Sequence, residues 1–314
     1  MRKIFIAGHR GLIGSAVMRR LERNSDVDLI TRTRQELDLL DSQAVKRLFE
    51  LERPDAVVLA AGKVGGIVEN LNDPAAFLEE NLSIQSNVLS IARRSTAQRV
   101  VFFASSCMYP SNCDHAMSEN DLLSAPPEPS SIAYATAKLA GLQLCLAYNL
   151  QDGGSRFIPL IPNSVYGPHD NFDSDGGHVL AALVARFHGA KQAQMPGITL
   201  WGSGSPRREF IHADDLAECV DRLLKDNISS VEFPLNVGSG SDISIKELAS
   251  LIARVVGYEG EIIWDSRFPD GAQRKLLDSN RVRAIGWRPK LDLERGLEQT
   301  YEWYKSQIEN ASEG

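Results

Sequence analysis

An α/β fold built on a doubly wound parallel sheet is predicted by the first half of this 314-residue chain. Short, continuously apolar runs, typical of strands buried on both faces, alternate with longer segments that have helical periodicity. The first apolar run leads directly into three glycines, Gly8, Gly11 and Gly14. A glycine-rich strand-to-helix turn is typical of a dinucleotide-binding sheet. We therefore expect a Rossmann-type doubly wound parallel sheet with a smaller C-terminal α/β substrate-binding lobe.

The expected strands and helices alternate along the first half of the chain. Strands are expected at residues 4–7, 28–31, 56–60, 100–104 and 157–161, and helices at residues 12–23, 41–52, 74–94 and 132–149. Asp41 or Ser42 can cap the second helix, and Pro54 stops it. Beyond Pro168 the pattern loosens, with helices expected at residues 178–188, 214–225, 245–257 and 293–307. The expected domains are 1–165, joined by parts of 207–243, and 166–314.

The composition excludes several classes of protein. A net charge of -7 and a pI near 5.5 argue against nucleic-acid or anionic-membrane binding, which relies on an excess of Lys and Arg. No later run approaches the ~18 apolar residues of a membrane span, and the apolar run at 4–7 is too short for a secretory signal. The four cysteines show neither CxxC nor Cys/His metal spacing and form no disulfide scaffold. We expect a cytoplasmic protein without a metal site.

The glycine loop and the end of the second strand predict the cofactor. The loop runs Gly8, His9, Arg10, Gly11, Leu12, Ile13, Gly14, and the backbone N–H groups that follow can face a pyrophosphate. Arg32 and Arg34 stand about twenty residues further on, where an NAD site has an acid for the ribose 2′-hydroxyl. Guanidinium groups suit a 2′-phosphate, so NADP(H) is favoured over NAD. The alternatives are a structural turn without a ligand and arginines that only solvate a loop.

Three residues predict hydride-transfer chemistry. Tyr134 and Lys138 share one helical face, so the lysine can lower the pKa of the tyrosine and reach the cofactor ribose. Ser105, at the end of the fourth strand, can hydrogen-bond a carbonyl group and stabilise developing negative charge. Cys107 follows closely, and its thiol can remove and return a proton next to a ketone. This pairing suggests one pocket that both epimerises and reduces; the alternative for Cys107 is a small core side chain.

Six segments of the chain carry a specific resemblance, at residues 5–17, 63–67, 105–110, 166–172, 201–212 and 269–278. Through them the chain resembles the GDP-L-fucose synthases, which are GDP-4-keto-6-deoxy-mannose 3,5-epimerase/4-reductases of the extended short-chain dehydrogenase/reductase family. The resemblance implies NADPH-dependent conversion of a GDP-sugar substrate. It also implies a homodimer formed through the helices at 74–94 and 132–149.

The same resemblance implies the roles of individual residues. Ser105, Tyr134 and Lys138 would reduce the ketone, while Cys107 and His178 would be the base and acid of epimerisation; a helix-start cap is the alternative for His178. Further cofactor contacts would come from Asp38, Leu39, Ala104, Ser105, Ser106, Lys138, Pro162, Asn163, Ser164, Val165 and His178. The GDP-sugar would be bound by Arg186, Trp201, Arg208, Asp270 and Lys275, although core packing remains an alternative for Trp201.

One departure from the family leaves the exact substrate open. The family commonly has Pro-Thr-Asn after the fifth strand, whereas this chain has Pro162-Asn163-Ser164. A sister enzyme that acts on another GDP-4-keto-deoxy sugar, and epimerises only one carbon, would retain almost every residue named above. A sugar dehydratase is disfavoured, because Ser106 and Cys107 stand where it would have an Asp-Glu pair. A non-enzymatic NADP(H)-binding protein would have little use for the complete set of reactive side chains.

Overall fold

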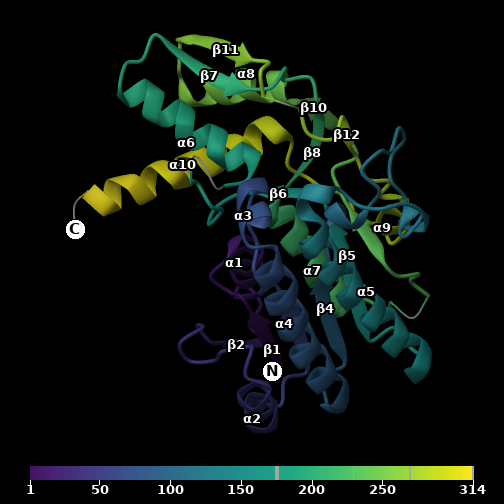
Figure 1. Ribbon diagram of the computed structural model, residues 1–314. Helices are drawn as coiled ribbons and strands as arrows, with labels where there is room; N and C mark the ends of the chain where they lie inside the picture. The colour runs from purple at the N-terminus through teal and green to yellow at the C-terminus, as the bar shows by residue number, and fades with distance from the viewer. Residues whose placement is uncertain (174–176, 229, 269, 313–314) are drawn as a thin grey trace.

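The computed structural model describes residues 1–173, 177–228, 230–268 and 270–312; Pro269, which opens the last resemblance segment, lies outside the described residues. A six-stranded sheet forms the centre of the N-terminal part (Figure 1). In spatial order its strands are β2 (Val27–Thr31), β1 (Arg2–Ala7), β3 (Ala56–Leu59), β4 (Arg99–Phe103), β5 (Phe157–Pro162) and β9 (Leu235–Val237). All five pairings are parallel, and β1 lies between β2 and β3, so the strand order reverses there. The predicted fold class is confirmed, and ligands bind at such a reversal point.

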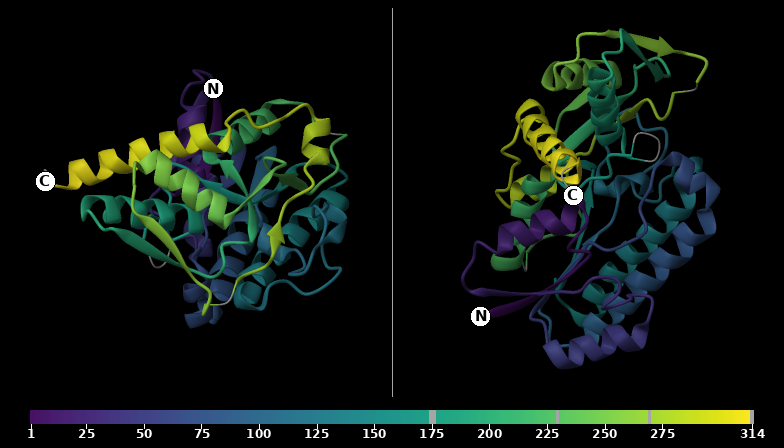
Figure 2. Two further views of the ribbon diagram at one scale, coloured as in Figure 1. Left: turned by 90° about the horizontal axis from the view of Figure 1, so that it is seen from above. Right: turned by 90° about the vertical axis from the view of Figure 1, so that its left-hand side faces the viewer.

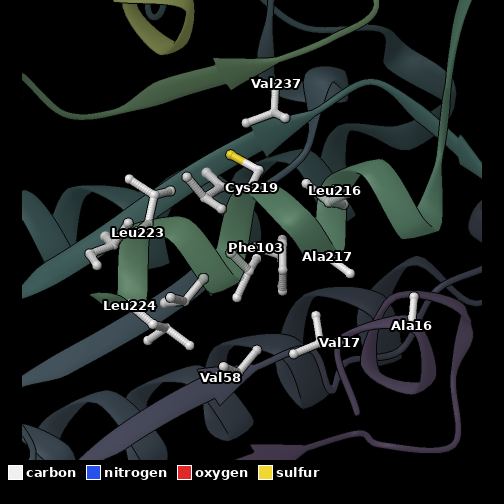
Figure 3. Close-up of a cluster of buried hydrophobic side chains, with 14 of the residues drawn as sticks. Ala16, Val17, Val58, Phe103, Leu216, Ala217, Cys219, Leu223, Leu224 and Val237 are labelled. Carbon is white, nitrogen blue, oxygen red and sulfur yellow. The ribbon is translucent and has the colours of Figure 1, made fainter. Parts of the chain in front are cut away.

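Helices cover both faces of this sheet. On one face α4 (Pro74–Arg94) packs against α5 (Ile132–Asp152) and against α2 (Ser42–Glu52). On the other face α1 (Leu12–Leu21) packs against α7 (Ala213–Lys225). Figure 3 shows the α1 and α7 side chains, with Cys219 among them, packed over apolar side chains of the sheet. Because neighbouring strand residues point to opposite faces, Ile4 and Ile6 enter this core while Phe5 and Ala7 enter the other.

The second half of the chain builds a separate layer above the carboxyl ends of the sheet strands (Figure 1). Its elements are β6 (Ser164–Tyr166), α6 (Val179–Gln192), β7 (Gly197–Trp201), β8 (Arg207–His212), β10 (Asp242–Ser244), α8 (Ile245–Val256), β11 (Glu261–Asp265), β12 (Arg274–Lys275) and α10 (Leu293–Ser312). The short helix α9 (Asn280–Ala284) packs against β9 of the central sheet. Strand β8 pairs with β6, β10 and β12, and β7 pairs with β11. Helices α6, α8 and α10 pack around a third core cluster, as Figure 2 shows from two further directions.

The expected elements are present, with shifts at their ends. Asp41 caps α2, its side chain accepting hydrogen bonds from the backbone N–H groups of Gln43 and Ala44. The chain also contains short elements that were not expected, among them α3 (Ile67–Asn72) and β9. Strands β6 and β7 belong to the C-terminal layer, but the later α7 and β9 return to the central sheet, α7 covering it and β9 pairing with β5. The chain therefore crosses between the two layers more than once. The domain boundary near residue 165 stays a prediction.

Among the described residues, every helix is too short or too polar to cross a lipid bilayer.

Candidate active site

The three glycines of the first turn lie in different structural surroundings. Gly8 adopts a φ of 87°, and a Cβ there would lie 2.7 Å from the backbone nitrogen of Ala61. A Cβ on Gly14 would lie 2.1 Å from the carbonyl oxygen of Gly8, so the helix packs closely on the strand. At Gly11 an added Cβ would meet nothing nearer than 3.6 Å, which leaves the N-terminus of α1 open to a ligand.

A cavity of about 620 Å³ opens beside this turn. Residues of the glycine loop line it together with Arg10, Arg32, Arg34, Asp38 and Leu39. Arg32 donates to Glu52, and Arg34 lies 4.0 Å from Glu80 with three quarters of its side chain exposed. Three guanidinium groups beside an open helix N-terminus fit a dinucleotide that carries a 2′-phosphate. Ile13 and Gly14, at the end of the loop, do not line the cavity.

Sequence reasoning missed several residues of this cavity. The chain after β3 supplies Ala60, Ala61, Gly62 and Lys63, and α4 supplies Glu80 and Ile84. Lys63 donates to Asp73 at 3.0 Å and to Glu80 at 3.3 Å. The available signal was position, because the residues after β3 lie at the same carboxyl edge as the glycine loop. Glu36, by contrast, accepts a hydrogen bond from the backbone N–H of Thr33 and stabilises a turn.

The structure brings Ser105, Tyr134 and Lys138 together at the carboxyl end of β4. Lys138 donates from Nζ to the carbonyl oxygen of Phe103 at 2.9 Å, and Nζ lies 5.7 Å from the centroid of the Tyr134 ring. Burial lowers the pKa of Lys138 to about 8. Burial, followed by the charge of Cys107, raises the pKa of Tyr134, whereas its hydrogen bond with Ser105 acts in the opposite direction. The pKa of Tyr134 is therefore raised and not lowered as we expected from its neighbour Lys138, because burial outweighs the other effects, and the phenol keeps its proton.

Cys107 belongs to the same cluster and is only partly buried. It is the middle residue of the turn Ser106–Met108 after β4, and its backbone N–H donates to Ser105 Oγ at 3.3 Å. Burial raises the pKa of the Cys107 thiol, while a hydrogen bond with Ser105 and the charges of Lys275 and Lys138 lower it. Two lysines facing one thiol are unlike the apolar surroundings of a core cysteine. The arrangement can stabilise a thiolate that forms during catalysis.

His178 stands at the N-cap position of α6, but its side chain caps no backbone N–H of the helix. Its Nδ1 lies 3.3 Å from Asp170 Oδ1, and Asp170 is almost fully buried. The hydrogen bond with Asp170 is the main cause that raises the pKa of His178, and Glu69 of α3 adds a smaller effect. The helix-cap alternative is therefore wrong for the side chain. The sequence did not reveal Asp170 as the partner that orients this imidazole.

The segment after β5 forms a buried hydrogen-bond network that sequence reasoning also missed. Ser106 Oγ donates to Asn163 Oδ1 at 3.0 Å, and Asn163 Nδ2 donates to Glu209 Oε2 at 2.7 Å. Glu209 is fully buried and also accepts from the backbone N–H groups of Gly240 and Leu277. Asn163 stands where the family pattern has another residue, and its side chain thus connects the turn Ser106–Met108, which we call the catalytic turn, to β8. Of the other predicted cofactor contacts, Ala104 follows β4, Pro162 ends β5, and Ser164 and Val165 lie in β6.

The five predicted substrate residues lie in the C-terminal layer. Arg208 of β8 and Lys275 of β12 are direct neighbours in parallel strands, so Lys275 links this layer to Cys107. Trp201 is exposed and stacks on Phe268 with ring centroids 4.4 Å apart, which rules out core packing for Trp201.

The remaining two predicted substrate residues have partners within the C-terminal layer. Asp270 accepts hydrogen bonds from the backbone N–H and the hydroxyl of Ser203. Arg186 of α6 donates to the carbonyl oxygen of Thr199. Among the described residues, no hydrogen bond or ion pair joins His178, Arg186, Trp201 or Asp270 to the cluster of Ser105, Cys107, Tyr134 and Lys138, which we call the Ser105 cluster.

A parallel Rossmann-type sheet with a serine, tyrosine and lysine at its carboxyl edge defines a short-chain-dehydrogenase type of epimerase or reductase. The chain belongs to the NAD dependent epimerase/dehydratase family, whose model matches residues 4–238.

Two relatives and one solved structure agree with this assignment. The Escherichia coli (strain K12) GDP-L-fucose synthase is 45% identical over 96% of this chain and 96% of its own length. The probable GDP-L-fucose synthase 1 of Oryza sativa subsp. japonica is 46% identical over 98% of this chain and 94% of its own. The structure of the Campylobacter jejuni GDP-mannoheptose C4 reductase with NADP bound is 35% identical, with a TM-score of 0.87 over 97% of this chain and 98% of that chain.

Proposed function

We propose that this chain converts GDP-4-keto-6-deoxy-D-mannose to GDP-L-fucose by 3,5-epimerisation followed by NADPH-dependent reduction of the 4-keto group. One observation carries the proposal: the Cys107 thiol shares a site with Ser105, Tyr134 and Lys138. A reductase alone has no use for that thiol, whereas an epimerase needs a group that removes a proton next to a ketone. The names of the two relatives support the same product, GDP-L-fucose.

Reduction uses the side of the site formed by Ser105, Tyr134 and Lys138. The glycine loop and the three arginines would hold NADPH, whose chemistry would be to supply a hydride for C4 of the sugar. Tyr134 donates its proton to the C4 oxygen, and Ser105 hydrogen-bonds that oxygen as negative charge develops on it. Lys138 lies close to Tyr134, so its positive charge stabilises the phenolate that remains.

Epimerisation uses Cys107 and His178. The protons at C3 and C5 are both adjacent to the C4 ketone, so each can leave to a base while an enolate forms. Cys107 takes the proton as a thiolate, whose negative charge Lys275 and Lys138 stabilise, and becomes a neutral thiol as the enolate forms. His178 returns a proton to the opposite face, and the pKa that Asp170 raises keeps its protonated form available near neutral pH. Among the described residues His178 forms no hydrogen bond with Cys107, and we place the sugar between the two side chains.

Substrate recognition falls to basic and aromatic side chains of the C-terminal layer. Arg208 and Lys275, neighbours in the β8–β12 pair, can contact the diphosphate of a GDP-sugar. We assign Trp201, Arg186 and Asp270 to the nucleoside end, where the exposed tryptophan ring offers a surface for stacking.

Incubation with NADPH and a panel of GDP-4-keto-6-deoxy sugars tests the proposal. We expect GDP-4-keto-6-deoxy-D-mannose to give GDP-L-fucose, with the configuration at C3, C4 and C5 read by NMR. A product reduced at C4 but unchanged at C3 and C5 would refute the epimerase half of the proposal.

A second candidate is a sister enzyme that acts on another GDP-4-keto sugar. It is favoured by the likeness to a GDP-mannoheptose C4 reductase and by Asn163 and Ser164, which depart from the family pattern beside the catalytic turn. In the same panel this function would appear as preferred turnover of a different sugar, or as inversion at one carbon only.

Cofactor preference gives a separate prediction. Replacing Arg34→Glu places a carboxylate where we propose the 2′-phosphate, so the ratio of kcat/KM for NADPH over NADH should fall at least about tenfold, because a hydrogen bond to a charged group contributes about 1.5–3 kcal/mol. Arg47→Glu is the matched control, since Arg47 lies on α2 and pairs with Asp41 outside the cavity lining. Equal use of NADH and NADPH by the unmodified enzyme would show that the arginines serve another purpose.

We further propose that the enzyme is cytoplasmic and forms a homodimer through α4 and α5. These two long helices pack side by side over one face of the sheet, which offers a broad surface to a second copy. A monomeric mass in solution, measured by light scattering, would rule out the dimer.

A further inference from the structure

A cluster outside the active site joins a thiol, an imidazole and a carboxylate. Cys113, His115 and Asp121 lie in the connection between β4 and α5, and their candidate ligand atoms are all within 4.8 Å of one another. Cys113 Sγ is 3.6 Å from His115 Nε2, which is 3.2 Å from Asp121 Oδ2. The three residues follow no familiar metal-binding spacing, so the sequence alone did not predict the cluster.

These separations match the edges of a tetrahedral zinc site. With Zn–S of about 2.3 Å and Zn–N and Zn–O of about 2.0–2.1 Å, tetrahedral ligands lie about 3.5 Å apart for S and N and about 3.3 Å apart for N and O. Thiolate, imidazole and carboxylate are all zinc ligands, and a thiolate disfavours the hard cations Mg²⁺ and Ca²⁺.

The surroundings hold two of the ligands in place. Asp114 Oδ1 lies 3.0 Å from His115 Nδ1, so it can accept the Nδ1 proton and leave Nε2 free to bind a metal. Asp121 accepts hydrogen bonds from the backbone N–H and the hydroxyl of Ser118, which fix its carboxylate. More than half of the His115 side chain is exposed, which leaves a path for an ion and room for water as a fourth ligand.

We propose that Cys113, His115 and Asp121 bind one Zn²⁺, with the thiol proton of Cys113 passing to solvent. The same connection is tied to the C-terminal layer, because Met117 exchanges backbone hydrogen bonds with Leu276 and Asp278 at 2.8 Å each. Leu276 directly follows Lys275, the lysine that faces Cys107. The zinc site therefore stabilises the loop of Cys113 to Asp121, whose hydrogen bonds hold the segment that follows Lys275 near the catalytic turn.

Titration of the metal-free protein with Co²⁺ tests the site through its absorption spectrum. We expect one equivalent of Co²⁺ to give a thiolate-to-cobalt charge-transfer band and the intense visible bands of a tetrahedral ion, both removed by one equivalent of Zn²⁺. Cys113→Ser should abolish the charge-transfer band, and His115→Ala should abolish binding. Asp114→Asn should weaken binding by about 10- to 100-fold, the effect typical of an orienting partner.

Cys107→Ser is the matched control, because it removes the other partly buried thiol and should leave the cobalt spectrum unchanged. Circular dichroism of each variant confirms that it is folded. Absence of the band in the unmodified protein, its persistence in Cys113→Ser or its loss in Cys107→Ser would each overturn the proposal.

Discussion

The substitution Tyr134→Phe should lower the rate of NADPH oxidation by about 10²- to 10⁴-fold, the usual effect of losing a general acid. The change removes one hydroxyl group and little volume, so the ring keeps its edge contact with Phe77. Binding of NADPH, measured by fluorescence titration, should therefore change little. The measurement is the steady-state rate with GDP-4-keto-6-deoxy-D-mannose.

Tyr148→Phe provides the control for this variant. Tyr148 lies on the same helix α5 but packs against Phe157, away from the Ser105 cluster. The Tyr148→Phe variant should reduce the substrate at the rate of the unmodified enzyme. If Tyr134→Phe did the same, Tyr134 could not be the proton donor.

Replacing Cys107→Ala should stop proton exchange at the sugar carbons while leaving hydride transfer possible. The variant lacks the thiol that takes the C3 and C5 protons, but it keeps Ser105, Tyr134 and Lys138. In deuterated water we expect no incorporation of deuterium at C3 and C5, and any reduced product should keep the configuration of the substrate at both carbons. The control is Cys145→Ala, which removes a fully buried thiol of the helix core and should retain exchange.

His178→Ala separates exchange from inversion. It removes the donor on the opposite face and leaves Cys107 in place, so partial exchange without inversion is expected. Exchange and inversion at unmodified rates in both Cys107→Ala and His178→Ala would leave a simple 4-ketoreductase.

The central sheet could be predicted because its signal is local. Buried parallel strands are continuous apolar runs, and the glycine turn has two requirements within one short segment, the positive φ of Gly8 and the close approach of Gly14 to Gly8. The short elements escaped prediction, because β9 has only three residues and is a strand by virtue of its pairing with β5. The helix α3 has only six residues, and its apolar members Ile67, Val68 and Leu71, like Val64 just before it, are exposed, so it buries no apolar face that a sequence pattern could reveal.

Individual site residues could be named from the sequence, but their partners could not. The pairing of His178 with Asp170, the electrostatic effect of Lys275 on Cys107 and the hydrogen bond between Asn163 and Glu209 all arise from tertiary packing. The Cys113 cluster is the clearest case, since its residues follow no metal-binding spacing and meet only because the loop folds back on itself. The catalytic roles of the site residues remain predictions that the experiments above test.

A single reaction of the unmodified enzyme in deuterated water tests most directly whether one pocket both epimerises and reduces. GDP-4-keto-6-deoxy-D-mannose and NADPH are supplied, and the product is analysed by NMR and mass spectrometry. The account predicts GDP-L-fucose that carries deuterium at C3 and at C5, with both centres inverted. A product without deuterium at either carbon, reduced but not inverted, would contradict it.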